Sequence, residues 1–218
     1  MHDDDGADNF PIVAIGASAG GLEALERFFS HVPPECGIAF VVIQHLSPDH
    51  KSMMAELLGR HTSLRIQVAA EGGAPEPNTL TLIPPKSILT LENGRFRLSD
   101  KPTSPTLTMP IDIFFTSLAK ERKEQAVGVV LSGTGSDGSR GVRAIRTAGG
   151  VVVVQLPNTA RFDGMPRSAL DTGAADLSAA PEDIPLRLVQ LAREGTLGPD
   201  DGTHTEPPAP TNCSRSSI

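Results

Sequence analysis

The feature of this sequence that most constrains its fold is a series of short apolar runs, most of them followed by a turn rich in small or polar residues. Runs that are apolar at every position are typical of parallel strands buried on both faces of a sheet. Five runs are expected to be strands, and all are mainly apolar, although the third also contains polar residues. They are residues 12–15, 38–43, 64–70, 126–131 and 151–155.

Segments with helical periodicity separate these runs. The expected helices are residues 22–29, 52–60, 111–123, 139–148, 166–171 and 181–192. Strand alternating with helix predicts an α/β fold with a doubly wound, mostly parallel sheet and helices on both faces. Residues 79–83 and 88–98 are expected to form a peripheral β-hairpin region, with Asn93 and Gly94 in a two-residue turn.

The 218-residue chain is expected to contain one folded domain and two tails. Residues 1–9 are polar and acidic, and residues 194–218 have few large apolar side chains, so we expect both to be disordered. The predicted domain, residues 10–193, holds 18 acidic and 18 basic side chains, so the net charge of −7 belongs to the tails. This balance indicates no basic surface for nucleic acid.

Several other classes of protein are excluded by composition. Two cysteines cannot make a disulfide scaffold or a Cys-rich zinc fold, and no apolar run approaches the roughly 20 residues that span a membrane. The acidic N-terminus has no apolar region of a signal peptide, so we expect a cytoplasmic protein without membrane insertion. Asp49, His50 and His61 have no further acid or Cys cluster beside them, so no metal is expected.

The first predicted strand end carries Gly16-Ala17-Ser18-Ala19-Gly20-Gly21. A dinucleotide-binding turn requires glycine where Ser18 stands, and an acid after the second strand, where Gln44 and His45 stand. The alternative is a nucleophile, Ser18, on a tight strand-to-helix turn, with the N–H of Ala19 donating to an oxyanion. A turn that only packs helix on strand, or that cradles a phosphate, remains a third interpretation.

Two further strand ends carry polar residues. His45 follows the second strand and could take the proton of Ser18, although a lone histidine is more often structural. Asp137 follows the strand at 126–131 within a glycine-rich loop, where it could orient His45. Taken alone, Asp137 is better explained as the cap of the helix that begins near Ser139.

The three strand ends taken together favour a catalytic site. Ser18, His45 and Asp137 each lie just beyond a predicted parallel strand, so all three are expected at one edge of one sheet. Their order along the chain differs from that of the α/β-hydrolases, but a triad is recognised by its geometry.

The chain resembles the catalytic domain of the CheB-type protein-glutamate methylesterases of chemotaxis over about residues 11–193. Four motifs carry the resemblance. They are Ile15-Gly16-Ala17-Ser18-Ala19-Gly20-Gly21, Val42-Ile43-Gln44-His45, Leu131-Ser132-Gly133-Thr134-Gly135-Ser136-Asp137-Gly138 and Gly164-Met165-Pro166-Arg167-Ser168-Ala169. The family's Ser-His-Asp triad falls on Ser18, His45 and Asp137, and its fold is a doubly wound α/β sheet.

The resemblance implies hydrolysis of a γ-glutamyl methyl ester on a chemoreceptor, without a cofactor, and in many members deamidation of receptor glutamines. Backbone N–H groups of Ala19 and Thr134 would stabilise the oxyanion. Gly20, Met165 and Arg167 would line the site, and Arg167 could attract an acidic receptor helix or simply cover a helix of its own domain. The expected partners are the cytoplasmic helices of a methylated chemoreceptor.

The sequence departs from the familiar chemotaxis enzymes in two respects. About ten residues precede the first strand, whereas a receiver domain needs on the order of 100, so we expect no receiver domain. Ala19 and Thr134 stand where those enzymes often carry Thr and Met, and the chain is more similar to versions fused to a CheR-type methyltransferase. A separate receiver domain or a CheR-type methyltransferase is therefore a candidate partner. The alternative to a methylesterase is a non-catalytic signalling module of the same fold.

Overall fold

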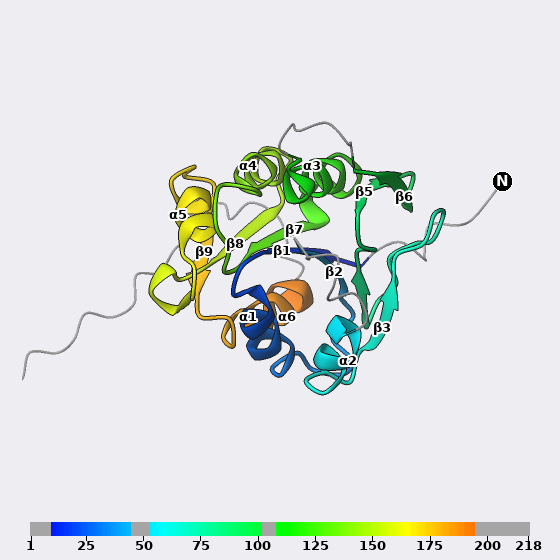
Figure 1. The fold of residues 1–218 in the computed structure, drawn as a ribbon, viewed down its shortest axis with the longest axis horizontal. Coiled ribbons are helices and arrows are strands. Elements are labelled where there is room, and N and C mark those ends of the chain that lie inside the picture. The colour runs from blue at the N-terminus through cyan, green and yellow to red at the C-terminus, as the bar shows by residue number, and fades with distance from the viewer. Residues whose placement is uncertain (1–9, 45–52, 102–107, 195–218) are drawn as a thin grey trace, which may run out of the picture.

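At the centre of the computed structural model, which describes residues 10–44, 53–101 and 108–194, lies a seven-stranded parallel sheet (Figure 1). The strand order is β3-β4-β2-β1-β7-β8-β9. The strands are β1 Ile12–Ala17, β2 Ala39–Gln44, β3 Arg65–Val68, β4 Thr79–Leu82, β7 Ala126–Val130, β8 Val151–Gln155 and β9 Leu177–Ala179. The chain first extends the sheet on one side of β1 and then on the other, which confirms the doubly wound prediction.

Strand β1 lies between β2 and β7, and all of its residues are buried. Ala17 pairs with Gln44 of β2, and Gly16 pairs with Val130 of β7. The three strands therefore end at the same edge of the sheet. The turns that follow them are brought together there.

Helices cover both faces of the sheet, as predicted (Figure 1). One face is covered by α1 (Gly21–Phe29), α2 (Met53–Gly59) and α6 (Ile184–Glu194); the other is covered by α3 (Pro110–Arg122), α4 (Ser139–Thr147) and α5 (Gly164–Leu170). Alternation along β1 separates two cores, because Val13 and Ile15 pack with the first set of helices while Ile12 and Ala14 pack with the second. Short 3-10 helices occupy Lys123–Gln125 and Pro157–Thr159.

The hairpin predicted around Asn93 and Gly94 is present as β5 (Ser87–Glu92) and β6 (Arg95–Asp100). Asn93 has φ 53° and Gly94 has φ 70°, the positive values that the favoured two-residue hairpin turns require. The hairpin lies beside α3 (Figure 1), where the hydroxyl of Ser117 accepts a hydrogen bond from the Leu91 N–H at 3.0 Å.

Strand β4 corrects the prediction for residues 79–83, because it lies in the main sheet between β2 and β3 instead of in the hairpin region. Its Thr-Leu-Thr-Leu sequence suggests a half-exposed strand, yet Thr79 and Thr81 are both buried. The hydroxyl of Thr81 accepts a hydrogen bond from Gln67 at 3.1 Å, so this polar group is buried with a partner. Strand β9 was not predicted, because three half-buried residues are too few to show the alternation of polar and apolar residues that indicates a strand.

The six predicted helices are all present, with ends shifted by at most three residues. Within the part of the chain that the structure describes, no helix has the length and apolar character needed to cross a membrane. The acidic tail predicted at residues 1–9, the tail beyond residue 194 and the segment that begins at His45 lie outside the described residues.

Candidate active site

Ser18 lies in the tight turn between β1 and α1, half-buried at the carboxyl edge of the sheet. The N–H of Gly21 donates to the Ser18 carbonyl at 2.9 Å and closes the turn. Gly20 has φ 69°, in the left-handed region where a side chain would be strained. The glycines of this motif therefore allow the backbone to turn sharply directly after the strand.

The Ser18 turn packs against the loops that follow β7 and β8. The Ser18 N–H donates to the carbonyl of Ser132 at 3.0 Å. A Cβ atom placed on Gly133 would lie 3.0 Å from the Cβ of Ser18, and one placed on Gly20 would lie 2.9 Å from Arg161. Glycine at these positions lets three loops approach one another more closely than side chains would permit.

Asp137 is 3% exposed and accepts three backbone hydrogen bonds. Its Oδ2 accepts from the N–H of Ile111 at 3.1 Å, and its Oδ1 accepts from the N–H groups of Asp112 and Gly138, both at 2.9 Å. Two of these donors belong to the first turn of α3. The interpretation of Asp137 as the cap of α4 is therefore wrong: its carboxylate caps a helix that begins 27 residues earlier in the chain.

Asp112 makes the reciprocal contact. It belongs to the first turn of α3, and its Oδ1 accepts from the N–H groups of Arg140 and Gly141 in α4 at 2.9 and 2.8 Å. Burial raises the pKa of the Asp112 carboxyl above its usual value; the N–H donors oppose this shift and the charge of Asp137 adds to it. The two carboxylates together bind the N-termini of two neighbouring helices at the edge where Ser18 lies.

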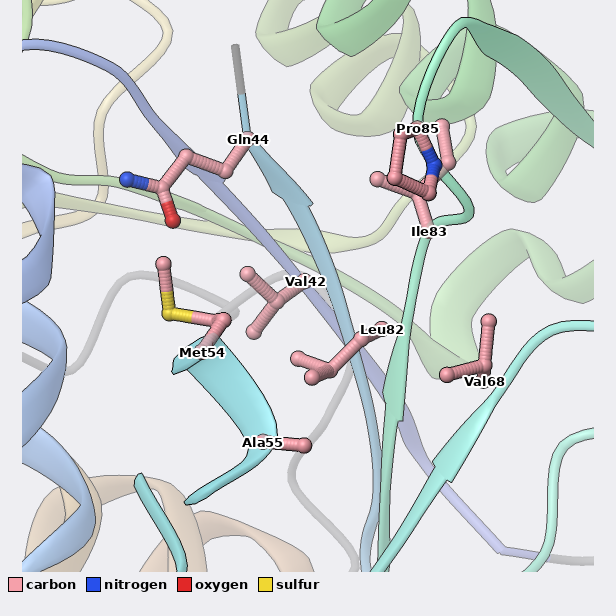
Figure 2. A pocket seen from close by; sticks show the side chains of 8 residues that line it. All are labelled: Val42, Gln44, Met54, Ala55, Val68, Leu82, Ile83 and Pro85. Atoms are coloured by element: carbon pink, nitrogen blue, oxygen red, sulfur yellow. The ribbon is translucent and has the colours of Figure 1, made fainter. Parts of the chain in front are cut away.

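The third predicted member of the triad, His45, lies outside the described residues. The residue before it, Gln44, ends β2 and pairs with Ala17, the residue before Ser18. Figure 2 shows the side chain of Gln44 beside Met54 of α2, in a small pocket of mostly apolar side chains. This cavity of about 40 Å³ has room for little more than water, whereas ligand pockets measure roughly 300 Å³ or more.

The other predicted site residues differ in exposure. Thr134 and Arg167 are exposed, and Arg167 forms an ion pair with Asp163, with 2.6 Å between Nε and Oδ2. Met165 is completely buried, and its N–H donates to the carbonyl of Gly133 at 2.9 Å. Met165 therefore supports the loop after β7 from inside the fold.

Two buried polar residues at this edge, Ser132 and Gln155, were not singled out from the sequence. Gln155 ends a strand whose other four residues are all valine, so a polar side chain in a wholly buried strand was the available signal. Exposed Phe162 also lies at this edge, where its ring would be 3.1 Å from a Cβ on Gly20. Among the described residues, no cluster of His, Cys, Asp or Glu could hold a metal ion.

The fold and the sequence both have relatives. The structure is similar to that of the Thermotoga maritima CheB methylesterase catalytic domain, with a TM-score of 0.78 and 28% identity, over 84% of this chain and 99% of that one. The sequence is 33% identical over 184 residues to a protein-glutamate methylesterase/protein-glutamine glutaminase of Burkholderia thailandensis, covering 84% of this chain and 54% of that protein.

A longer relative is an uncharacterised 104.1 kDa protein of Rhodobacter capsulatus, 50% identical over 146 residues, which are 66% of this chain and 15% of that protein. The chain thus spans about half the length of the Burkholderia enzyme and a small part of the Rhodobacter protein. The sequence model of the CheB methylesterases matches residues 13–188, which include the Ser18 turn and the Asp137 loop. The chain belongs to the CheB methylesterase family.

Proposed function

We propose that this chain hydrolyses methyl esters of glutamyl side chains on chemoreceptors, with Ser18 as the nucleophile. The observation that carries the proposal is the packing of the Ser18 turn against the loop after β7, at 3.0 Å between the Ser18 nitrogen and the Ser132 oxygen. That loop continues to Asp137. Membership of the CheB methylesterase family supports the class of reaction, because the Burkholderia relative carries the name protein-glutamate methylesterase/protein-glutamine glutaminase.

In this proposal His45 is the general base and Asp137 orients it. Ala17 and Gln44 are paired on adjacent parallel strands, so Ser18 and His45 each follow one member of that pair. The three backbone hydrogen bonds to Asp137 leave its carboxylate little freedom to rotate. A carboxylate so fixed can hold an imidazole in the tautomer that accepts the serine proton and can stabilise the imidazolium that forms.

The reaction proceeds in two acyl transfers. Ser18 Oγ bonds to the ester carbonyl carbon as His45 takes the hydroxyl proton, and the tetrahedral intermediate then expels the methoxy group, which takes that proton and leaves as methanol. Water, deprotonated by His45, attacks the acyl-enzyme. Collapse of the second intermediate breaks its bond to Ser18 Oγ, which takes the proton back from His45, and releases the glutamic acid side chain, which then loses a proton to solvent.

Two backbone N–H groups, those of Ala19 and Thr134, are assigned to the oxyanion. In a trans peptide the N–H points away from the carbonyl. The Ser18 carbonyl is engaged by Gly21 within the turn, so the Ala19 N–H points away from that hydrogen bond. Each oxyanion donor would contribute about 3 kcal/mol to transition-state stabilisation.

Around this centre, Gly20 lets the loops after β1, β7 and β8 pack closely and Met165 supports Gly133. Exposed Arg167 would bind an acidic receptor segment by exchanging its ion pair with Asp163 for a receptor carboxylate. Deamidation of receptor glutamines follows the same steps, with ammonia leaving in place of methanol. A cytoplasmic location, a catalytic domain at residues 10–193, and regulation through a separate receiver domain or a CheR-type methyltransferase complete the proposal.

A fluorophosphonate probe tests the nucleophile. We expect the probe to label the folded wild-type chain and not Ser18→Ala, whereas Ser136→Ala, which changes an exposed serine on the loop after β7, should label like wild type. Methanol release from methylated receptor should be lost in Ser18→Ala and should fall roughly 10³-fold or more in His45→Ala.

The same experiment separates an enzyme from a signalling module of the same fold. Absence of labelling and of methanol release in folded wild-type protein, together with retained binding to receptor helices, would favour the module. Labelling that persists in Ser18→Ala would assign the nucleophile to another residue.

A further inference from the structure

Ser132, the second residue after β7, is 1% exposed, and its backbone connects the centre of the site to the sheet. Its carbonyl accepts the hydrogen bond from the Ser18 N–H at 3.0 Å. Its own N–H donates to the side-chain oxygen of Gln155 at 2.8 Å. The backbone of Ser132 thus lies between the end of β8 and the proposed nucleophile.

The hydroxyl of Ser132 connects two further loops. Its Oγ donates to the carbonyl of Ala19 at 2.9 Å and accepts from the N–H of Phe162 at 3.0 Å. The Phe162 carbonyl is a second acceptor, 3.3 Å away, and it also accepts the N–H of Gly133. The loops after β1, β7 and β8 therefore meet at one buried hydroxyl group.

Gln155 stabilises the position of the Ser132 backbone from within the sheet. Its side chain is buried at the end of a strand of valines, and its Nε2 donates to the hydroxyl of Thr159 at 3.2 Å while its Oε1 accepts from Ser132. A buried amide that is hydrogen-bonded at both ends has one favourable orientation. Gln155 thereby fixes the position of the Ser132 backbone relative to the sheet.

We propose that Ser132, supported by Gln155, is a positioning residue that holds the Ser18 turn in its reactive conformation; this inference rests on the ester hydrolysis proposed above. The turn contains two peptide planes on either side of Ala19. Gly21 fixes the first through the Ser18 carbonyl, and the Ser132 hydroxyl fixes the second through the Ala19 carbonyl. Both planes are thus oriented before substrate arrives. The Ala19 N–H assigned to the oxyanion lies in the first plane, and the Ser132 hydroxyl restrains it through the second plane, which meets the first at the Ala19 Cα.

Loss of the hydroxyl is expected to act on the chemical step more than on binding. The Ser132 side chain is buried and presents no surface of its own to a receptor, so receptor binding should be nearly unchanged. A displacement of reacting groups by about 1 Å can lower a rate 10²-fold. We therefore expect kcat in Ser132→Ala to fall roughly 10- to 100-fold with a KM within about twofold of wild type.

The experiment compares Ser132→Ala with Thr81→Val, which removes a different buried hydroxyl. That hydroxyl is bonded to Gln67 and lies on β4, which β2 separates from β1. Both variants should lower the melting temperature, because each removes a buried hydrogen bond. Only Ser132→Ala should lower kcat for methanol release and, by a similar factor, the rate of fluorophosphonate labelling. A wild-type kcat and labelling rate in folded Ser132→Ala would overturn the inference, as would an equal loss of kcat in Thr81→Val.

Gln155→Met provides the second variant if Ser132→Ala does not fold, because methionine keeps the shape of the side chain and removes the acceptor of the Ser132 N–H. Its control is Thr159→Val, which removes the outer hydrogen bond of Gln155 and leaves the inner one. We expect kcat to fall in the first and to stay within about twofold in the second; equal values in both would overturn the inference. Wild-type chain that neither labels nor releases methanol would instead overturn the proposed function itself.

Discussion

Carboxylates accept backbone N–H groups at several places among the described residues, and two of these places differ strongly in exposure. At the N-termini of α3 and α4, Asp137 and Asp112 are 3% and 7% exposed and accept five such hydrogen bonds between them. At the hairpin, exposed Glu71 accepts the N–H of Leu98 at 2.6 Å and forms an ion pair with Arg97 at 3.0 Å.

The difference shows how the same interaction serves two purposes. A buried carboxylate that lost its donors would remain unsolvated, so its position is strongly fixed by them. An exposed carboxylate exchanges its donors for water at little cost, and salt screens its ion pair. Fixed position is what a catalytic group requires, and the buried pair lies at the edge that carries Ser18.

The largest expected effect follows from Asp137→Asn. One amide oxygen cannot replace both carboxylate oxygens, so the N–H of Ile111 would face an NH₂ group, and stability should fall by about 1–3 kcal/mol. Methanol release should fall roughly 10³-fold or more, because a neutral amide no longer stabilises the imidazolium. Steady-state kinetics with urea unfolding measure both effects. Asp171→Asn, an exposed position at the end of α5, serves as the control and should match wild type.

A smaller effect, of opposite sign, is expected from Asp112→Asn. A single oxygen, Oδ1, accepts both hydrogen bonds from α4, and an asparagine keeps that oxygen. Because burial raises the pKa of Asp112, the unfolded chain loses its proton first as the pH rises. Wild-type stability therefore decreases from about pH 4 up to the raised pKa, and the loss remains at higher pH.

The asparagine variant has no such titration, so its stability relative to wild type should increase between pH 4 and pH 7. Urea unfolding across that range measures the difference. A relative stability that decreases with pH would contradict the assigned direction of the Asp112 pKa.

Much of the fold was predictable because the apolar runs of a buried parallel sheet are unambiguous. The strands at residues 12–17, 39–44, 126–130 and 151–155 were all predicted within two residues at either end. Strand β4 was misassigned because Thr79 and Thr81 look solvent-facing, and the partner that permits burial of Thr81, Gln67, lies on another strand. Such a partner is visible only once the strands are paired.

The site shows the same limit. Strand ends indicated Ser18, His45 and Asp137 as a set, which stays a prediction. Two of the three described backbone donors to Asp137 come from residues 111 and 112, and the donor to the Ser132 hydroxyl comes from another loop, so a local sequence pattern predicts neither network. Contacts between distant segments decide which of several ordinary serines and aspartates become fixed.

The smallest effect is expected from Glu71→Gln, which changes the exposed carboxylate at the hairpin. The Leu98 N–H, and then Arg97, lower the pKa of Glu71, so its contribution to stability is present above the pKa of the unfolded chain and is lost as the pH falls through the folded value. The glutamine keeps an acceptor for Leu98 and loses the attraction to Arg97. The melting temperature at pH 7 should therefore decrease slightly at low ionic strength and equal that of wild type in about 1 M salt, where the Debye length is roughly 3 Å. Methanol release should be unchanged at both ionic strengths, and a loss of activity in this variant would mean that the hairpin, as well as the buried helix ends, positions the catalytic groups.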